Sequence, residues 1–258
     1  MAERAGRRAD YGLDAPGIVG GFAAAGARGV AGAAATWHYL LPRRPLLAAL
    51  VGGGCGLASA TGLGTAAAMV LSSKSGKYRV RDRLLDDLAL RGDETLLDVG
   101  CGRGLLLLGA ARRLPRGRAV GLDVWRREDQ SGNSRETTLA NARAEGVADR
   151  VAVEDGDARA MPFPDATFDV VVSSLALHNI RDAEGRARAL GEVARVLRPG
   201  GRVALVDFQH TVEYAAALAA ASFRDVRRSD SIRAMHPPVR IVTGTKGERR
   251  RTADGRRQ

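Results

Sequence analysis

The run from Leu46 to Leu71 contains 26 residues and no charged side chain. As one α-helix with a rise of about 1.5 Å per residue, it would be about 39 Å long, which exceeds the ~30 Å hydrocarbon core of a bilayer. Much of the run is alanine and glycine, which favour membrane insertion less than leucine or isoleucine do. A buried core helix and a Gly/Ala-rich linker are the alternatives, but the length and the lack of charge favour a membrane-spanning helix.

A second apolar run, Gly17–Leu41, comes earlier in the chain and is interrupted only by Arg28 and His38. The short polar segment Pro42–Pro45 separates the two runs, so together they predict a helical hairpin with spans at about 17–41 and 46–71. A cleaved signal peptide fits poorly, because there are two long spans and the first begins late. Small residues recur at every fourth position, a pattern that lets helices approach closely within one chain or between two chains of a homo-oligomer. These rows are Gly21, Ala25, Gly29 and Ala33 in the first run, and Gly52, Gly56 and Ala60 in the second.

Basic residues flank the predicted hairpin unevenly. The turn between the spans holds Arg43 and Arg44. The outer flanks hold more cations: Arg4, Arg7 and Arg8 before the first span, and Lys74, Lys77, Arg79, Arg81 and Arg83 after the second. Because cytoplasmic loops carry the excess of Lys and Arg, both termini are predicted to be cytoplasmic. The chain is therefore expected to be a multi-pass protein of the cell membrane.

The overall charge is strongly basic, with 40 Lys and Arg against 29 Asp and Glu, a net charge of +11. Nearly all cations are arginines, so the excess reflects either a general residue bias or a surface that attracts anionic partners such as lipid headgroups or nucleic acid. The arginine-rich tail 246–258 has no apolar face and is predicted to be disordered. The two cysteines and four histidines are scattered, so neither a disulfide framework nor a metal site is expected.

After Arg79 the pattern changes to alternating short apolar strands and helices, which indicates an α/β fold with a mostly parallel sheet. We expect a Rossmann-like, doubly wound sheet of seven strands, in a domain 74–245 that follows a polar N-terminus (1–16) and the hairpin (17–73). The expected strands are Thr95–Val99, Ala119–Val124, Val151–Val153, Val170–Ser173 and Val203–Phe208, and the expected helices include Leu105–Leu114, Arg135–Glu145 and Glu184–Leu197. The sequence Arg198-Pro199-Gly200-Gly201 is expected to end the last of these helices. Ligands of such folds bind beyond the carboxyl ends of the strands.

The first expected strand ends in Asp98, and Gly100, Gly102 and Gly104 follow at alternate positions. A dinucleotide-binding turn has its third glycine one residue later. The arrangement instead resembles the first motif of class I S-adenosylmethionine-dependent methyltransferases, most closely those of ubiquinone and menaquinone biosynthesis (methyltransferase type 11). The resemblance extends over about Leu84–Thr245.

Later segments occur in the order that this family shows: Gly121-Leu122-Asp123, Gly156-Asp157-Ala158, Phe163-Pro164-Asp165 leading into Phe168–Ser173, and Leu197–Arg202. The resemblance implies that Asp123 binds the ribose of S-adenosylmethionine, and that Asp157 and Ala158 contact its adenine. The cofactor-binding residues so implied are Asp98, Gly100, Cys101, Gly102, Gly104, Asp123, Val124, Asp157, Ala158 and Ser173. Simpler roles exist for two of them, a helix N-cap for Asp98 and a turn residue for Asp157.

Methyl transfer requires mainly the alignment of donor and acceptor, and a base if the acceptor loses a proton. His178 follows the fourth expected strand and His210 the fifth, so these two are the candidate catalytic residues. The polar stretch Trp125–Asn133 follows the second strand. It either covers the cofactor, faces the acceptor, or is a solvated loop.

We therefore expect a membrane-anchored methyltransferase that acts on a small, hydrophobic or lipid-like acceptor at the cytoplasmic face. A non-catalytic module that binds S-adenosylmethionine, a nicotinamide enzyme and a nucleic-acid methyltransferase are the alternatives. Ser173-Ser174-Leu175-Ala176 stands where methylases of base amino groups have Asn-Pro-Pro-aromatic, which disfavours the last.

Overall fold

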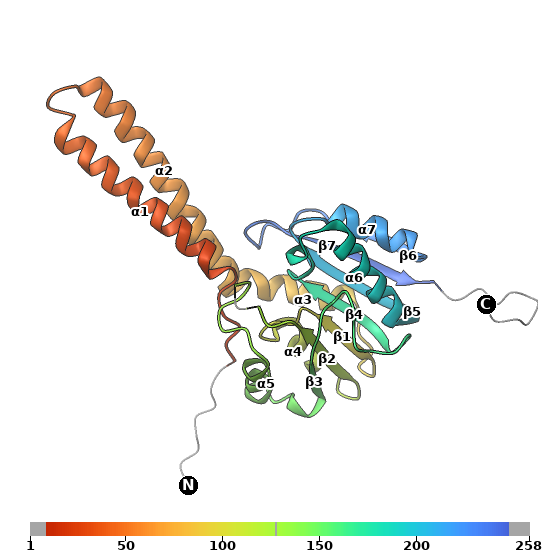
Figure 1. Cartoon of the computed structure of the whole chain (residues 1–258). Helices are drawn as coiled ribbons and strands as arrows, with labels where there is room; N and C mark the ends of the chain where they lie inside the picture. The colour runs from red at the N-terminus through yellow and green to blue at the C-terminus, as the bar shows by residue number, and fades with distance from the viewer. Residues whose placement is uncertain (1–8, 127, 248–258) are drawn as a thin grey trace, which may run out of the picture.

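The computed structural model describes residues 9–126 and 128–247. A two-helix hairpin projects from an α/β domain (Figure 1). Its helices are α1 (Pro16–Tyr39) and α2 (Pro45–Leu71), so helices are confirmed at both predicted spans. A proline begins each helix, at a position where the missing N–H has no helical partner in any case.

Glycines bring the two helices of the hairpin into backbone contact. A Cβ atom at Gly29 would lie 2.7 Å from the carbonyl oxygen of Cys55, and one at Gly62 would lie 2.8 Å from that of Phe22. Of the predicted rows, Gly29 is buried at this contact, whereas Gly21 and Gly56 have nothing within 4 Å of an added Cβ. Strict four-residue rows are thus the wrong description of the contact within the chain. A helix has 3.6 residues per turn, so a contact face alternates steps of three and four.

The hairpin joins the domain without a linker. A π-helical turn, η1 (Ser72–Gly76), continues α2 into α3 (Lys77–Asp87), which buries Val80, Leu84 and Leu85 against the domain. A Cβ atom at Gly76 would collide with the carbonyl of Ala234, so glycine is required where this helix crosses the domain surface. The boundary expected between residues 73 and 74 falls inside continuous helix.

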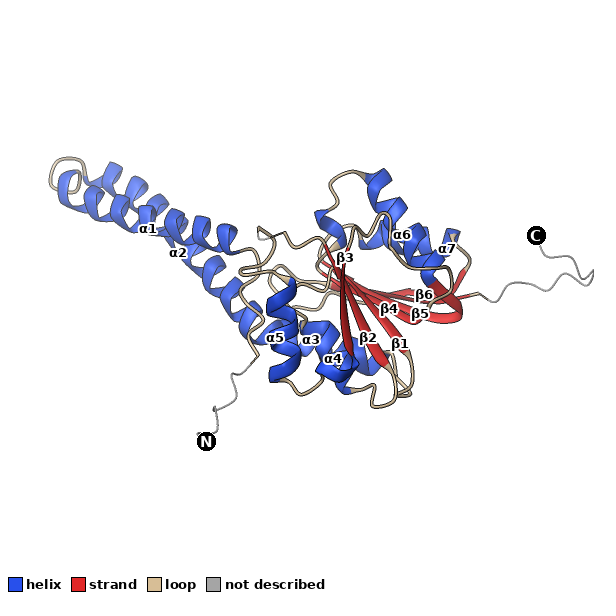
Figure 2. Cartoon of the chain, turned by 60° about the horizontal axis from the view of Figure 1, so that its bottom comes forward, coloured by secondary structure: helices blue, strands red, loops and turns tan. Residues whose placement is uncertain are grey.

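The sheet has seven strands in the order β3-β2-β1-β4-β5-β7-β6, and only β7 is antiparallel to the rest. The strands are β1 (Thr95–Val99), β2 (Arg118–Asp123), β3 (Val151–Asp155), β4 (Phe168–Ser174), β5 (Leu197–Asp207), β6 (Phe223–Arg228) and β7 (Arg240–Lys246). Two layers of helices cover it (Figure 2): α3, α4 (Leu105–Arg112) and α5 (Arg135–Ala144) on one face, α6 (Ala183–Val196) and α7 (Thr211–Ala220) on the other. Short 3₁₀ turns are η2 (Ala148–Arg150) and η3 (Leu177–Asn179). The predicted doubly wound, mostly parallel sheet is confirmed.

Strands at the centre of the sheet are buried on both faces, as expected of parallel strands between helices. Leu96 and Leu97 of β1 are fully buried and belong to the cores on opposite faces. The segment Arg198–Gly201 does not merely end α6, as expected; it lies inside β5, which begins at Leu197 opposite Phe168. A bulge between Phe168 and Val170 accommodates the extra residues.

The described part of the polar N-terminus packs against the domain. Tyr11 is 3% exposed and belongs to the core beside α3 and α4, and its hydroxyl donates to Glu145. Residue 246 is the last of β7, so the sheet extends one residue into the predicted tail. The remainder of that tail from 248 lies outside the described residues, as do residues 1–8.

Candidate active site

The glycine turn follows β1, which has β2 as its neighbour on one side and β4 on the other. The strand order reverses at this point, so the turn lies at the switch point of the sheet. Gly100, Gly102 and Gly104 have φ of 73°, 52° and 89°, a region that favours glycine. A Cβ atom at Gly100 would collide with the side chain of Ala176, which follows β4. The alternate glycines thus permit both the path of the turn and its close approach to the segment after β4.

Asp98 is a buried carboxylate without a partner. It is 1% exposed, and neither of its oxygens has a hydrogen-bond partner among the described residues. Burial raises the pKa of Asp98 to about 8, and the nearby negative charge of Asp123 adds to the effect. A buried acid of this kind favours a cation at its side of the site.

Asp123, the last residue of β2, holds the glycine turn in place. Its carboxylate accepts hydrogen bonds from the backbone N–H groups of Gly102 (2.8 Å) and Trp125 (2.6 Å). The side-chain amide of Asn133 lies 3.4 Å from the same carboxylate. Because a carboxylate has about four acceptor positions, these contacts leave Asp123 able to accept further hydrogen bonds.

A cavity of about 1180 Å³ opens over this turn. Of the predicted cofactor residues, it is lined by Asp98, Gly100, Cys101, Gly102, Asp123, Val124, Asp157 and Ala158. Gly104 and Ser173 are not among the lining residues. Gly104 is the N-cap of α4, and the Ser173 hydroxyl donates to the Val99 carbonyl (2.7 Å) between β4 and β1. The neighbouring Ser174 lines the cavity in its place.

Asp157 lines the cavity together with its ion-pair partner. Arg159 Nη2 lies 2.5 Å from Asp157 Oδ2, and the backbone N–H of Arg159 donates to the other oxygen. Hydrogen bonding from the Arg159 side chain lowers the pKa of Asp157, which is therefore ionised at neutral pH. Asp157 is thus a half-exposed, charged acceptor that contrasts with the buried Asp98.

The stretch Trp125–Asn133 covers one wall of the cavity, to which it contributes Arg126, Glu128, Asp129, Gln130 and Asn133. Gln130 connects it to the glycine turn, because its side-chain oxygen accepts the Arg103 backbone N–H (2.9 Å). Its amide nitrogen lies 3.2 Å from the carbonyl of Tyr11. Of the three roles considered for this stretch, that of a loop that only faces solvent is therefore wrong.

His178 lines the cavity and is paired with a buried acid. Its Nδ1 lies 2.9 Å from Asp207 Oδ1, and its backbone N–H donates to Asp207 Oδ2. Asp207 is 1% exposed and also accepts from the Tyr214 hydroxyl (3.1 Å) and the Phe208 backbone N–H (2.8 Å). The ring of His178 packs against Phe208, with centroids 4.5 Å apart. Nδ1 thus faces Asp207 at ion-pair distance without meeting hydrogen-bond geometry, and the ring is held by the contact with Phe208 and by the backbone N–H of His178.

His210 lies elsewhere. It is the N-cap of α7, its Nδ1 is 3.4 Å from Glu213, and it is not among the residues that line the cavity. The geometry therefore supports His178 and gives no support to His210 as a catalytic residue. At the end of the fifth strand, the residue connected to the site is Asp207, through its contact with His178, and not His210.

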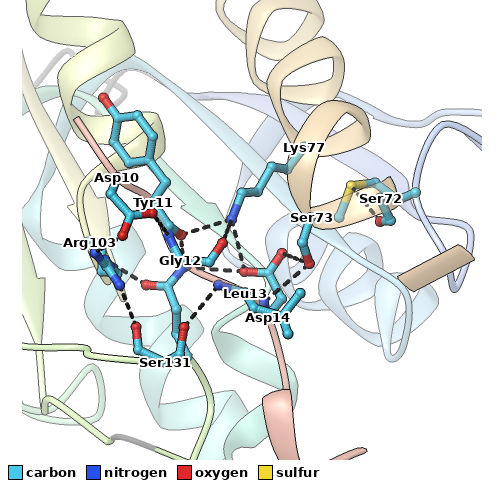
Figure 3. Close-up of polar contacts among 12 residues, drawn as sticks. Asp10, Tyr11, Gly12, Leu13, Asp14, Ser72, Ser73, Lys77, Arg103 and Ser131 are labelled. Atoms are coloured by element: carbon cyan, nitrogen blue, oxygen red, sulfur yellow. Dashed lines mark hydrogen bonds and ion pairs between the residues drawn. The ribbon is translucent and has the colours of Figure 1, made fainter. Parts of the chain in front are cut away.

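An N-terminal strap, residues 9–15, links the glycine turn to the base of the hairpin (Figure 3). The buried Lys77 of α3 donates to the carbonyls of Tyr11 (2.8 Å) and Gly12 (2.9 Å) and lies 3.4 Å from Asp14. At the other end, Arg103 is 2.8 Å from Asp10. Burial lowers the pKa of Lys77, and the charge of Asp14 opposes that shift.

Sequence reasoning missed several residues of the cavity wall. The hairpin contributes Ile18 and Phe22 from α1, and Thr65 and Met69 from α2. Asp207, which ends β5, does not line the cavity but contacts His178, and the strand-end rule that selects His178 applies to it equally. Among residues 9–126 and 128–247, no group of three or more His, Cys, Asp or Glu side chains is placed to hold a metal ion.

The fold and the glycine turn define an α/β domain with a cavity at the switch point of its sheet. Residues 97–205 match the family model described as "Methyltransferase domain". This matched segment is less than half of the chain and includes the glycine turn after β1.

Among curated proteins, the chain is 40% identical over 132 residues to a 27-O-demethylrifamycin SV methyltransferase of Amycolatopsis mediterranei, covering 50% of this chain and 44% of that protein. It is 37% identical over 134 residues to the ubiquinone/menaquinone biosynthesis C-methyltransferase UbiE of Dinoroseobacter shibae, covering 52% and 50%. The chain thus spans about half the length of the curated relatives it matches.

Among solved structures, the [4+2]-cyclase SpnF has a TM-score of 0.56 at 22% identity, covering 66% of this chain and 82% of that one. A SAM-dependent methyltransferase from Aquifex aeolicus has a TM-score of 0.51 at 19% identity, covering 64% and 88%. These similarities establish the fold. Since a cyclase shares it, the fold alone does not specify the reaction.

Proposed function

We propose that this protein is a membrane-anchored, S-adenosylmethionine-dependent methyltransferase whose acceptor is a small, hydrophobic or lipid-like molecule. The observation that carries this proposal is one continuous cavity lined by the glycine turn, by His178 and by the base of the hairpin. At about 1180 Å³ it exceeds the ~300–1,000 Å³ typical of a pocket for one small ligand, so it has room for donor and acceptor together.

The residues around the glycine turn fit S-adenosylmethionine. The unpartnered carboxylate of Asp98 suits the positive charge that this cofactor carries, and the exposed backbone of Gly100 and Gly102 suits its close approach. Asp123 and Asp157 are acceptors for ribose hydroxyls and an amino group. Cys101, Val124 and Ala158 supply the apolar remainder of this wall. When bound, the cofactor supplies an electrophilic methyl group on sulfur.

His178 is the proposed base for an acceptor that loses a proton. Asp207 lies 2.9 Å from Nδ1 of the imidazole, on the side away from Nε2, and Nε2 is the atom proposed to take the proton of an acceptor hydroxyl or activated carbon. Phe208 and Leu175 line the same part of the cavity and limit the access of water to it.

The hairpin is the proposed membrane anchor. Among the described residues, twelve of the fourteen exposed large apolar side chains lie on α1 and α2. At about 1.5 Å per residue, the 24 residues of α1 and the 27 of α2 are long enough to cross a ~30 Å hydrocarbon core. Trp37 and Tyr39 are exposed at the far end, where aromatic side chains favour the membrane interface. Arg28 opposes insertion by about 3 kcal/mol, which the uncharged α2 offsets.

Cations at the base of the hairpin support a cytoplasmic domain. Of the five cations that follow the second predicted span, two are turned inward. Lys77 holds the strap, and Arg81 pairs with Asp82. Lys74, Arg79 and Arg83 remain exposed beside the base, against Arg43 and Arg44 at the tip. The positive-inside rule still favours the cytoplasmic side for the domain.

The direct test uses the full chain in lipid nanodiscs with methyl-tritiated S-adenosylmethionine and a membrane lipid extract. We expect tritium in the organic phase, lost in an Asp123→Ala variant. Binding of the cofactor without any transfer would instead indicate a non-catalytic module. Transfer to RNA or DNA, rather than to the extract, would indicate a nucleic-acid methyltransferase.

A further inference from the structure

Two side chains of α1 lie both at the rim of the cavity and on the exposed surface of the hairpin. Ile18 and Phe22 line the cavity, yet they are 57% and 40% exposed. A residue with both properties marks an opening. The cavity that begins at the glycine turn therefore opens onto the flank of α1.

The wall opposite this opening comes from α2 and its continuation. Thr65, Met69 and Ser72 follow one another at steps of four and three, and so lie on one face of the helix. Ser72 fixes this wall to the domain, because its hydroxyl contacts Met235 Sδ (3.4 Å) and accepts the His236 backbone N–H (3.0 Å). Ile18 and Phe22 likewise share one face of α1. The passage thus lies between two helix faces and a fixed loop of the domain.

The opening lies at a defined depth along the hairpin. Phe22 is six residues beyond the start of α1, and Thr65 is six residues before the end of α2, about 9 Å in each case at ~1.5 Å per residue. An anchored hairpin would place this level near the boundary between headgroups and acyl chains, ~5–10 Å into the leaflet.

We propose that the base of the hairpin is the binding site for the apolar chain of a membrane-dissolved acceptor, which enters the cavity sideways from the bilayer. Phe22, Thr65 and Met69 contact the chain, and its polar ring or headgroup reaches His178. This inference rests on the proposed function and specifies its substrate class: an amphiphile with one apolar chain and a polar head. Its chain remains in an apolar environment throughout, so extraction into water is not required.

The passage is tested with the full chain in nanodiscs of phosphatidylcholine and phosphatidylglycerol. The probe is a farnesyl-chain phenol that carries a photoreactive diazirine beside the ring. After illumination, mass spectrometry is expected to find the label on the domain side of the cavity, at Leu175–His178 and Phe208. Thr65→Trp, which fills the passage, and Ile18→Trp, which closes the rim, are each expected to lower this labelling about tenfold, equivalent to ~1.4 kcal/mol of binding free energy.

Leu57→Trp is the matched control, because Leu57 lies on α2, is 71% exposed and does not line the cavity. It should leave domain-side labelling unchanged. Calorimetry with S-adenosylhomocysteine monitors the folded cofactor site in every variant. If that ligand binds while the label stays confined to the outer surface of the hairpin, or if both tryptophan variants label the domain like the unmodified protein, the passage does not exist. Failure of S-adenosylhomocysteine to bind the unmodified protein would instead count against the proposed function, whatever the labelling pattern.

Discussion

At the scale of single residues, the site sets two acids in opposite environments. Asp98 is buried without a partner, whereas Asp207 is buried with four contacts, from His178, Phe208 and Tyr214. An unpartnered buried carboxylate destabilises the protein when it ionises, but a satisfied one holds its neighbours in place. The first is therefore suited to attract a charged ligand and the second to orient a side chain.

Asp98 is expected to make the ligand-free protein less stable as pH rises. Its pKa is raised from 3.8 to about 8, so the folded state binds the extra proton between these values. The free energy of unfolding should then fall with pH in this window, by up to about 1.4 kcal/mol per pH unit. Asp98→Asn should flatten the slope and weaken S-adenosylmethionine binding. Thermal unfolding measured from pH 4 to pH 8 checks the slope, and an unchanged slope in the variant would contradict the assignment.

His178 and Asp207 are expected to act as a pair. His178→Ala should lower kcat by about 10²–10⁴-fold, the usual contribution of a general base, with little change in the KM for the cofactor. Asp207→Asn keeps the shape but removes the charge that orients the imidazole, and should lower kcat in the same direction. His210→Ala is the control and should retain activity. Initial rates of tritium transfer provide the measurement, and equal losses in the two histidine variants would argue against the pair.

At the scale of elements, the strap and the hairpin depend on backbone contacts. Lys77 holds two carbonyls of the strap, and Gly29 allows α1 and α2 to touch. Neither contact involves residues that are near in sequence. Each contact joins two elements, and the sequence pattern of one element does not indicate that it packs against the other.

Lys77→Met is expected to destabilise the protein by about 3 kcal/mol, because it leaves the carbonyls of Tyr11 and Gly12 and the Asp14 carboxylate without their cation. Lys74→Met is the matched control, since Lys74 is exposed on η1, the turn that leads directly into α3. Denaturation of the detergent-solubilised protein, followed by tryptophan fluorescence, measures the difference. Equal stabilities of the two variants would mean that the strap is not held by Lys77.

Gly29→Val is expected to separate the helices of the hairpin, because its Cβ would lie 2.7–2.8 Å from backbone atoms of Cys55 and Ser59. Gly21→Val meets nothing within 4 Å and is the control. A cysteine introduced at Gly32 would lie beside the native Cys55, so disulfide trapping between the two reports the contact. Trapping should be lost in Gly29→Val and retained in Gly21→Val. Retention in both would exclude this packing.

At the scale of the whole molecule, the helical rod from Pro45 to Asp87 fixes the hairpin to the domain, so an anchored hairpin also sets how the cavity meets the membrane. We expect both termini on one side of the membrane and the turn at Arg43 on the other. A membrane-impermeant maleimide should label Arg43→Cys in intact spheroplasts, and Glu184→Cys only in inverted vesicles. Labelling of both positions from the same side would refute a two-span hairpin.

The sequence by itself determined the elements and their order, because apolar periodicity, glycine turns and strand-end acids are local properties. It located both hairpin helices, the parallel core of the sheet, and the cavity positions from Asp98 to Ala158. It did not find the Asp207–His178 contact, the strap held by Lys77, or the part that Phe22 and Met69 take in the cavity wall. Only the tertiary structure decided these, since each depends on the distance between segments far apart in the chain. Burial and pairing are properties of that spatial arrangement, and no spacing along the chain encodes them.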